Sequence, residues 1–421
     1  MAANVTKVLT GTHSELITAC SVKLRAFRFG KVGYSSMRKM GILTYHYSNN
    51  YGGVLQSYAL YKYLKLLSID VEIIDCVPSS YKVDSVIHNV FYFTGLRKDP
   101  LKINWEDFIP RIFFARLSAK RQFNKRVVHN FDLFRNLNME LSARVDEKTV
   151  NEIIQEYEAI IVGSDQIWSV GQRTKPVYFL GFEGFDGDKI SYAADSTIAE
   201  VSEEHLAKLR GELGDFDKIS VRNKHSQKFV ETVIGEKPPI VVDPTLLWDF
   251  DELGRGFMSD SDPYILVYVL GKDISGSNRK AIEEIKRIYG DLKVYAIVIP
   301  TMKFNICDYA DKVFYDLGPE EWLDMIRNAT FVYTDSFHGT LFSLKFHKPF
   351  LAYYAEAMRA TRFIDLAERY QIGRYIVSSV DEIEAKGSLL ETPDFATIDQ
   401  LIEEHRAFSI RFLEEALGID S

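Results

Sequence analysis

Short apolar runs alternate with amphipathic segments along the chain from Met40 onward. Residues 54–64 place their apolar side chains on about half of a helical circumference, which is typical of a helix packed on a sheet. Strand-like runs flank this helix and continue after it, at residues 41–45, 70–75, 159–162, 189–193 and 218–221. The alternation predicts βα units around a mostly parallel sheet.

A second alternating set begins at residues 264–270, after a Gly- and Asp-rich stretch at 249–262 that we interpret as a linker. Ser277 and Gly290 are suited to begin and end a helix between two of its strands. The pattern therefore predicts an α/β protein with two Rossmann-like, doubly wound domains. Sheets of this kind bind ligands beyond the carboxyl ends of their strands, so we expect the site in a cleft between the domains.

The predicted boundaries follow from this alternation. Residues 40–248 form the N-terminal domain and residues 263–395 the C-terminal domain. Residues 1–39 form an N-terminal extension. Residues 81–138 mix aromatic and basic side chains without a clear strand, so we predict a helical insertion in the first domain. Residues 396–421 include a helix that is long enough to pack back on the first domain.

Composition narrows the class of protein. The chain of 421 residues is 46% hydrophobic and 26% charged, as expected for a globular protein. Its net charge of −8 argues against nucleic acid as the main partner. The cysteines Cys20, Cys76 and Cys307 have unrelated spacings and support neither a disulfide framework nor a zinc site. No apolar run is long enough to cross a bilayer and no signal peptide is evident, so we expect a cytoplasmic protein.

A basic stretch lies at residues 97–135, where ten Lys or Arg stand against four Asp or Glu and alternate with aromatic and aliphatic residues. A solvated helical face explains such a stretch. The alternative is peripheral contact with an anionic membrane surface, on the inner face of the plasma membrane.

Residues 331–349 carry the most informative chemical pattern, FVYTDSFHGTLFSLKFHKP. A strand delivers Thr334 and Asp335 to its carboxyl end, and a tight turn then presents His338 at the start of a helix. Free N–H groups at a helix start favour a bound phosphate or carboxylate, and a histidine there can exchange protons beside it. The alternative is that His338 is structural and caps the helix.

Two further segments carry polar groups at predicted strand ends. In VGSDQIW, Asp165 is a candidate base for a sugar hydroxyl, although its side chain also suits a turn. Ser164 and Trp168 of the same segment are candidate sugar contacts, and aromatic rings such as Trp168 either stack on sugars or fill a core. The other segment is a flexible polar loop suited to a sugar or an anion, with Asn49, Asn50, Gly52, Gly53 and Gln56. It matches neither GxGxxG nor GxxxxGK[ST].

Six segments, in order between about residues 40 and 365, resemble the polysaccharide pyruvyl transferase family: SNNYGGVLQSYAL, VGSDQIWS, ISYAADS, ISVRN, VDPTLL and YTDSFHGTLFSLKFHKPF. The resemblance implies a glycosyltransferase-B-like fold. It also implies transfer of a pyruvyl group from phosphoenolpyruvate to a pair of sugar hydroxyls, which forms a ketal and releases phosphate. The expected acceptor is a polysaccharide or lipid-linked oligosaccharide precursor of a bacterial capsule or exopolysaccharide.

The resemblance also implies roles for residues. The histidine matching His338 is regarded as catalytic, and the arginine matching Arg222 contacts phosphoenolpyruvate. Well-studied members carry Arg two positions before this histidine, where this chain has Ser336, and we consider Arg362 a candidate to replace it. The start of the helix completes the expected donor site with Ser336, Phe337 and Gly339. The alternative for Arg222 is a surface ion pair at a strand end.

We expect no metal and no cofactor apart from phosphoenolpyruvate as donor substrate, because no ligand pattern such as HExxH or paired Cys occurs. Two other functions stay open. One is a glycosyltransferase of the same fold that uses a sugar nucleotide. The other is a non-catalytic sugar-binding homologue.

Overall fold

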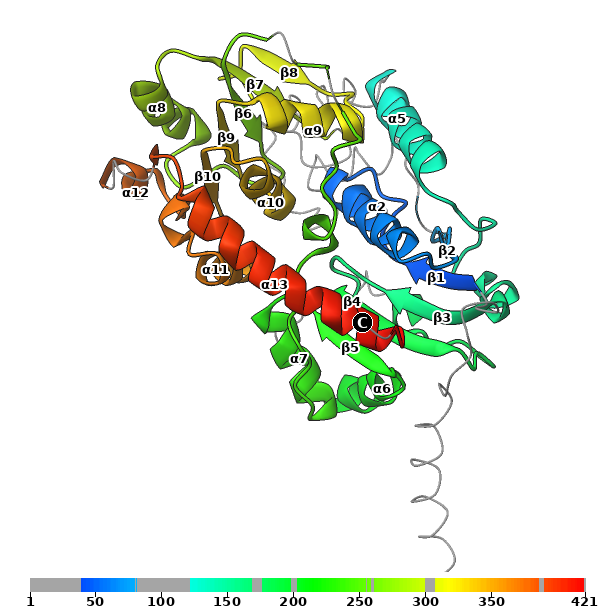
Figure 1. Ribbon diagram of the computed structural model, residues 1–421. Coiled ribbons are helices and arrows are strands. Elements are labelled where there is room, and N and C mark those ends of the chain that lie inside the picture. Colours follow the sequence, from blue (N-terminus) through cyan, green and yellow to red (C-terminus); the bar gives the residue numbers. More distant parts are fainter. Residues whose placement is uncertain are drawn as a thin grey trace, which may run out of the picture.

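In the computed structural model the described residues are 39–79, 81, 122–168, 176–197, 203–254, 256–258, 261–299, 307–385 and 390–419. They form two parallel β-sheets with helices packed around them (Figure 1). This confirms the predicted α/β class with two doubly wound domains. The predicted N-terminal extension, apart from Lys39, and most of the predicted insertion at 81–138 lie outside the described residues.

The first sheet has the strand order β2-β1-β3-β4-β5, and all of its pairs are parallel. Its strands are β1 (Lys39–Leu43), β2 (Val71–Ile73), β3 (Tyr157–Val162), β4 (Asp188–Ala194) and β5 (Lys218–Val221). Apolar residues fill both faces, as with Ile160 and Ile161 on β3, which are both fully buried. Such continuous apolar strands are typical of a parallel sheet covered on both sides.

The helices of the first half are α2 (Tyr51–Leu66), α5 (Gln122–Asn138), α6 (Glu203–Gly214) and α7 (Lys224–Ile234). Short 3₁₀ turns lie at η1 (Val150–Glu152), η2 (Ile154–Glu156), η3 (Pro176–Phe179) and η4 (Pro244–Leu246). The Asn50 side chain caps α2 by accepting a hydrogen bond from the Gly53 amide. Most of α2 is buried all round, which fits a helix enclosed between the domains.

The second sheet has the order β11-β10-β9-β6-β7-β8. Its strands are β6 (Tyr264–Tyr268), β7 (Lys293–Ile297), β8 (Lys312–Phe314), β9 (Phe331–Thr334), β10 (Phe350–Tyr353) and β11 (Ile376–Val377). Its helices are α8 (Asn278–Tyr289), α9 (Pro319–Asn328), α10 (Phe337–Lys345), α11 (Ala357–Arg369) and α12 (Val380–Ala385), with a 3₁₀ turn η5 (Gly373–Tyr375).

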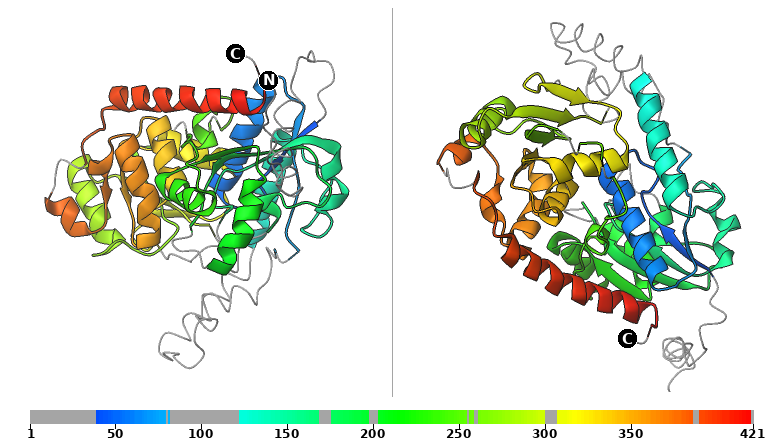
Figure 2. Two further views of the ribbon diagram at one scale, coloured as in Figure 1. Left: turned by 90° about the horizontal axis from the view of Figure 1, so that it is seen from below. Right: turned by 45° about the horizontal axis from the view of Figure 1, so that its top comes forward.

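The two domains are joined by more than the linker. Tyr51 of α2 stacks on Trp322 of α9, with ring centroids 5.3 Å apart, and donates a hydrogen bond to the Leu317 carbonyl. The last long helix, α13 (Phe395–Ala416), runs from the second domain across to β4 and β5 of the first (Figures 1 and 2). The Ser409 hydroxyl of α13 accepts a hydrogen bond from the Val242 amide. These contacts hold the domains against each other.

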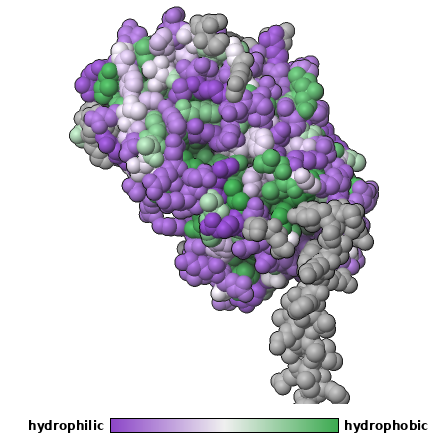
Figure 3. Space-filling model, viewed as in Figure 1, coloured by the Kyte–Doolittle hydropathy of each residue, from purple (hydrophilic) through white to green (hydrophobic). Residues whose placement is uncertain are grey.

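The face drawn in Figure 3 is mainly hydrophilic, and its apolar side chains gather in small patches. Within the described ranges, none of the helices combines the length and the apolar character needed to span a membrane.

Candidate active site

Arg222, directly after β5, is surrounded by three carboxylates that come from the ends of neighbouring elements. Its Nη1 donates to Asp243 Oδ2 at 2.9 Å, and its Nη2 donates to Asp195 Oδ2 at 2.5 Å and Asp165 Oδ1 at 3.4 Å. The Arg222 side chain is only 1% exposed, so it is not the surface ion pair that the sequence left open. Its guanidinium also lies over the Phe337 ring, 4.5 Å from the centroid.

The electrostatics of this cluster favour the ionised forms of Arg222 and Asp195. Burial acts to lower the pKa of Arg222, but Asp195, Asp243 and Asp165 together raise it above its ordinary value. Burial acts to raise the pKa of Asp195, yet Arg222 and Arg362 leave it lowered. Each charge is thus stabilised by its neighbours, and the cluster is a buried network in which the partners depend on one another.

His338 faces this cluster from the second domain, in the first turn of α10. Its Nε2 lies 3.5 Å from Asp243 Oδ2 and is buried, without a hydrogen-bond partner among the described residues. Burial acts to raise the pKa of Asp243, but His338 and then Arg222 lower it below its ordinary value. The His338 side chain is 9% exposed, so the predicted cleft is nearly closed at this point.

Helix α10 is capped by Ser336, not by His338. The Ser336 hydroxyl accepts a hydrogen bond from the Gly339 amide at 3.1 Å, and the Ser336 amide donates to the Thr334 hydroxyl. The capping alternative for His338 is therefore wrong. The predicted donor contacts of Ser336 and Gly339 stay predictions, because the Ser336 hydroxyl only accepts in this cap and still carries an O–H that can donate.

The first turn of α2 packs directly on the imidazole of His338. A Cβ atom added to Gly52 would lie 2.0 Å from His338 Nδ1, so only glycine permits this approach. Gln56 on the same helix accepts from the Ser164 amide at 3.0 Å, and the Ser164 hydroxyl donates to the Ala193 carbonyl at 2.9 Å. The predicted loop and the predicted VGSDQIW segment thus meet beside His338.

Asp165 is the most accessible carboxylate of the cluster. Its side chain is 21% exposed, whereas those of Asp195 and Asp243 are 2% and 1% exposed. Its backbone has a φ of 74°, a left-handed conformation that aspartate tolerates better than most residues. Asp165 therefore fits the backbone of the turn and also presents its carboxylate to the junction of the two domains.

Helix α11 brings a further set of charges to the cluster. Asp365 accepts from the Lys224 amide at 3.1 Å, and Arg369 donates to the Arg222 carbonyl at 2.8 Å. Arg362, the predicted replacement cation, lies on the same helix, and its charge lowers the pKa of Asp195. The structure thus brings Arg362 into the electrostatic surroundings of Arg222.

The sequence profile of the polysaccharide pyruvyl transferase family matches residues 50–355. The chain belongs to the polysaccharide pyruvyl transferase family. The match includes every residue of the cluster formed by Arg222, its three carboxylates and His338. Membership of this family supports polysaccharide pyruvylation in general. No curated protein matches the sequence.

Solved structures with a similar chain path include two UDP-GlcNAc 2-epimerases and a UDP-glucosyltransferase. UDP-GlcNAc 2-epimerase of Methanocaldococcus jannaschii is 14% identical, with a TM-score of 0.45 over 87% of this chain and 98% of that chain. The enzyme of Neisseria meningitidis is 9% identical, with a TM-score of 0.49 over 91% and 100%. A UDP-glucosyltransferase from Polygonum tinctorium is 13% identical, with a TM-score of 0.40 over 92% and 99%. These similarities are too low to carry a functional argument.

The Trp168 side chain does not line the candidate site of this pyruvyl transferase family member, although its backbone amide donates to the Asp195 carbonyl. Its side chain is fully buried, its Nε1 donates to the Tyr178 carbonyl at 3.1 Å, and its ring packs near Phe179 and Phe216. The ring fills the core of the first domain and is not available to a sugar in this structure. The core-filling alternative is the one that the packing supports.

The sequence analysis did not identify two carboxylates of the Arg222 cluster, Asp195 and Asp243. A signal for both was present, because they stand in ISYAADS and VDPTLL, each directly after an apolar run. Within the described part of the chain, no three His, Cys, Asp or Glu side chains are grouped so that they could hold a metal ion.

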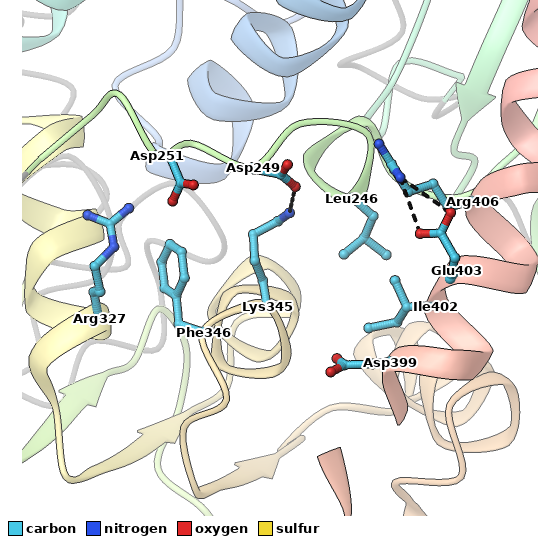
Figure 4. A pocket seen from close by; sticks show the side chains of 10 residues that line it. All are labelled: Leu246, Asp249, Asp251, Arg327, Lys345, Phe346, Asp399, Ile402, Glu403 and Arg406. Carbon is cyan, nitrogen blue, oxygen red and sulfur yellow. Dashed lines mark hydrogen bonds and ion pairs between the residues drawn. The ribbon is translucent and has the colours of Figure 1, made fainter. Parts of the chain in front are cut away.

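A separate cavity of about 440 Å³ lies at the other end of α10, between the linker and α13 (Figure 4). Lys345 lines it, donates to the Trp248 carbonyl at 2.7 Å and faces Asp249 at 3.8 Å. Burial lowers the pKa of Lys345 to about 8. Lys345 is seven residues beyond His338, or about 10 Å along the helix, so this cavity is distinct from the cluster.

Proposed function

We propose that the protein transfers the pyruvyl group of phosphoenolpyruvate to two hydroxyls of one sugar and so forms a cyclic ketal. The acceptor is a polysaccharide or lipid-linked oligosaccharide precursor. One observation carries the proposal: an imidazole of the second domain, His338, faces a buried carboxylate of the first domain, Asp243, where the predicted active-site segments meet. Family membership supports the type of reaction.

The reaction balances with the groups that the site provides. A protonated His338 donates its proton to the methylene carbon of phosphoenolpyruvate, and the first sugar hydroxyl forms a bond to C2. The second hydroxyl then forms its own bond to C2, while the bond from C2 to the phosphate oxygen breaks. Of the two hydroxyl protons, one replaces the proton of His338 and the other leaves with the phosphate. No oxidant or reductant is required.

Asp243 and Asp165 have different tasks in this proposal. Asp243 is buried and faces Nε2 of His338, so it orients the imidazole and pairs with its protonated form. Asp165 is the more accessible carboxylate, so it accepts the second hydroxyl proton and passes it to the departing phosphate. Both roles use carboxylates that Arg222 already holds in place.

Donor binding by Arg222 differs from a simple pairing of a free cation with phosphate. Both of its terminal nitrogens are bonded to carboxylates, whereas its Nε is buried and has no hydrogen-bond partner among the described residues. We propose that Arg222 holds the acidic cluster together and offers Nε–H to the donor. Arg362 on α11 then supplies the second positive charge that the donor's phosphate and carboxylate need.

A direct test incubates the protein with phosphoenolpyruvate and a panel of sugars and measures phosphate. Phosphate released only when a sugar is present supports the proposal. Consumption of a sugar nucleotide without phosphoenolpyruvate supports the glycosyltransferase alternative instead. Loss of turnover in His338→Ala with an intact fold excludes the non-catalytic alternative.

The remaining parts of the proposal concern partners. We propose that no metal or further cofactor is needed, so activity should persist in a chelator.

Contact with an anionic membrane through residues 97–135 would bring the enzyme to a lipid-linked acceptor, but most of this stretch lies outside the described residues. Absence of binding to acidic vesicles at low salt would contradict that contact.

A further inference from the structure

A second cavity of about 440 Å³ lies in the first domain, where β1 and β2 end. Its lining includes Tyr47 and Asn49 from the loop after β1, Asp75 from the segment after β2, and Arg135 from α5. The carboxyl ends of parallel strands are where sheets of this kind bind ligands. No candidate residue in this lining has a role in the proton transfers described above.

The cavity is close to His338. Asn49 is three residues before Gly52, whose backbone touches the His338 imidazole. Three residues of chain span at most about 11 Å. A ligand in this cavity is therefore close enough to be part of the same acceptor molecule whose hydroxyls reach His338.

The lining has the chemistry of a site for an uncharged polar ring. The rings of Tyr47 and Tyr81 meet nearly edge to face, with centroids 4.9 Å apart, and offer apolar surface to a sugar ring. The charged side chains of the lining balance, because the carboxylates Asp75 and Asp132 are matched by two arginines, Arg135 and Arg144. Convergent donors and acceptors without net charge favour sugar hydroxyls over a phosphate or a carboxylate.

Asn49 supplies an unused donor at this place. Its Oδ1 accepts a hydrogen bond from Arg135 Nη2 at 3.3 Å, while its Nδ2 is buried and has no hydrogen-bond partner among the described residues. Arg135 also donates to the His46 carbonyl at 3.1 Å, so the loop that carries Asn49 is held in place. A buried amide without a partner is costly, and a ligand hydroxyl that accepts from it would remove that cost.

We infer that this cavity binds an uncharged sugar ring of the acceptor, adjacent to the ring that is pyruvylated. The inference rests on the proposed function, since it assigns the acceptor's second ring to a part of that site. Binding of this adjacent ring makes the enzyme selective for acceptors of at least two sugar units. Asn49 is then a specificity-determining residue.

The test compares methyl glycosides of glucose, galactose and mannose with disaccharides that carry the same terminal rings. The wild type should have a KM about tenfold lower for a disaccharide than for its matched monosaccharide. Asn49→Asp keeps the Oδ1 bond to Arg135 but replaces the unused donor. This variant should remove most of the tenfold preference, because its KM for the disaccharide should rise toward that for the matched monosaccharide.

Arg126→Gln is the matched control, because Arg126 is on the same helix α5 and pairs with Asp316 away from the cavity. It should keep the disaccharide preference. Equal KM values for mono- and disaccharides in the wild type, or an unchanged preference in Asn49→Asp, would overturn the inference.

Direct binding separates this inference from the proposed function. Saturation-transfer NMR of the same disaccharides, without donor, should show binding to the wild type and weaker binding to Asn49→Asp. If the wild type binds them in this way but releases no phosphate from phosphoenolpyruvate, the reaction is wrong and the cavity assignment stands. If phosphate is released but no disaccharide binds through Asn49, the cavity assignment alone is wrong.

Discussion

His338 Nε2 and Asp243 Oδ2 lie 3.5 Å apart although the two residues belong to different domains. Asp243 caps the turn η4 of the first domain, and His338 lies in the first turn of α10 in the second. The pair therefore exists only when the domains are packed together as they are here. The same carboxylate oxygen accepts from Arg222, so one atom links the imidazole to the buried cluster.

His338→Gln should reduce kcat by about 100-fold to 10,000-fold, because the variant cannot donate a proton to the donor's methylene carbon. Its thermal unfolding should stay close to that of the wild type. His347→Gln is the control, since His347 is half exposed and pairs with Asp399 beyond the end of α10. Equal activity of His338→Gln and His347→Gln would remove His338 from the mechanism.

Arg222→Gln should lower the free energy of unfolding at pH 7 by about 3 to 5 kcal/mol, because it leaves three carboxylates without their shared cation. Denaturant unfolding monitored by Trp fluorescence measures this loss. A loss below about 1 kcal/mol would show that the cluster is not a buried network in solution.

The same variant should change how stability depends on pH. In the wild type, Asp195 and Asp243 have pKa values below the ordinary 3.8, so their stabilising contribution is present above about pH 4 and is lost as the pH falls further. Without Arg222, the largest cause that lowers the pKa of Asp195 is lost, so burial raises this pKa and the folded variant binds more protons than its unfolded chain. The stability of the variant relative to the wild type should therefore improve between pH 7 and pH 5. A constant difference would contradict this account.

Ser336→Ala should cost about 1 kcal/mol through loss of the cap on α10, and Ser336→Gly only a few tenths. The KM for phosphoenolpyruvate should stay the same in both variants, because we propose that Arg222 and Arg362 bind the anionic groups of the donor. A marked rise in that KM without loss of stability would mean that Ser336 contacts the donor after all.

Lys345→Met should stabilise the protein at pH 7. Lowering the pKa of Lys345 from 10.5 to about 8 costs about 3.5 kcal/mol at about 1.4 kcal/mol per pH unit. Loss of the hydrogen bond to the Trp248 carbonyl reduces the gain from the substitution by about 1 kcal/mol. The folded wild type binds fewer protons than its unfolded chain between pH 8 and 10.5, so the cost is full below pH 8 and disappears as the pH rises. The advantage of the variant, measured by thermal unfolding, should shrink over that range. An advantage that does not vary with pH would contradict the assignment.

The alternation of apolar runs and amphipathic segments predicted the two-sheet class because parallel strands are buried on both faces and so form recognisable runs. It did not predict α11, which carries Arg362, Asp365 and Arg369 to the cluster. The β8 strand was also missed. It is only three residues long and has one fully apolar, buried position at Phe314.

The candidate site was predicted more by resemblance than by local pattern. His338, Asp165 and Arg222 meet in space because they follow β9, β3 and β5, whose carboxyl ends face the domain junction. Sequence alone did not show that Asp243 and Asp195 bond the two terminal nitrogens of Arg222, since charge pairing between distant segments depends on the packing of the chain. It also did not distinguish Trp168 as a core residue from Trp168 as a sugar contact.

The most direct measurement of the central claim is a reaction of the wild type with phosphoenolpyruvate and a disaccharide, followed by phosphorus NMR and mass spectrometry of the sugar. We predict that inorganic phosphate appears in equal amount to a sugar whose mass has increased by one pyruvate less one water. Phosphoenolpyruvate that stays intact with every sugar tested, while a sugar nucleotide is consumed, would contradict the account.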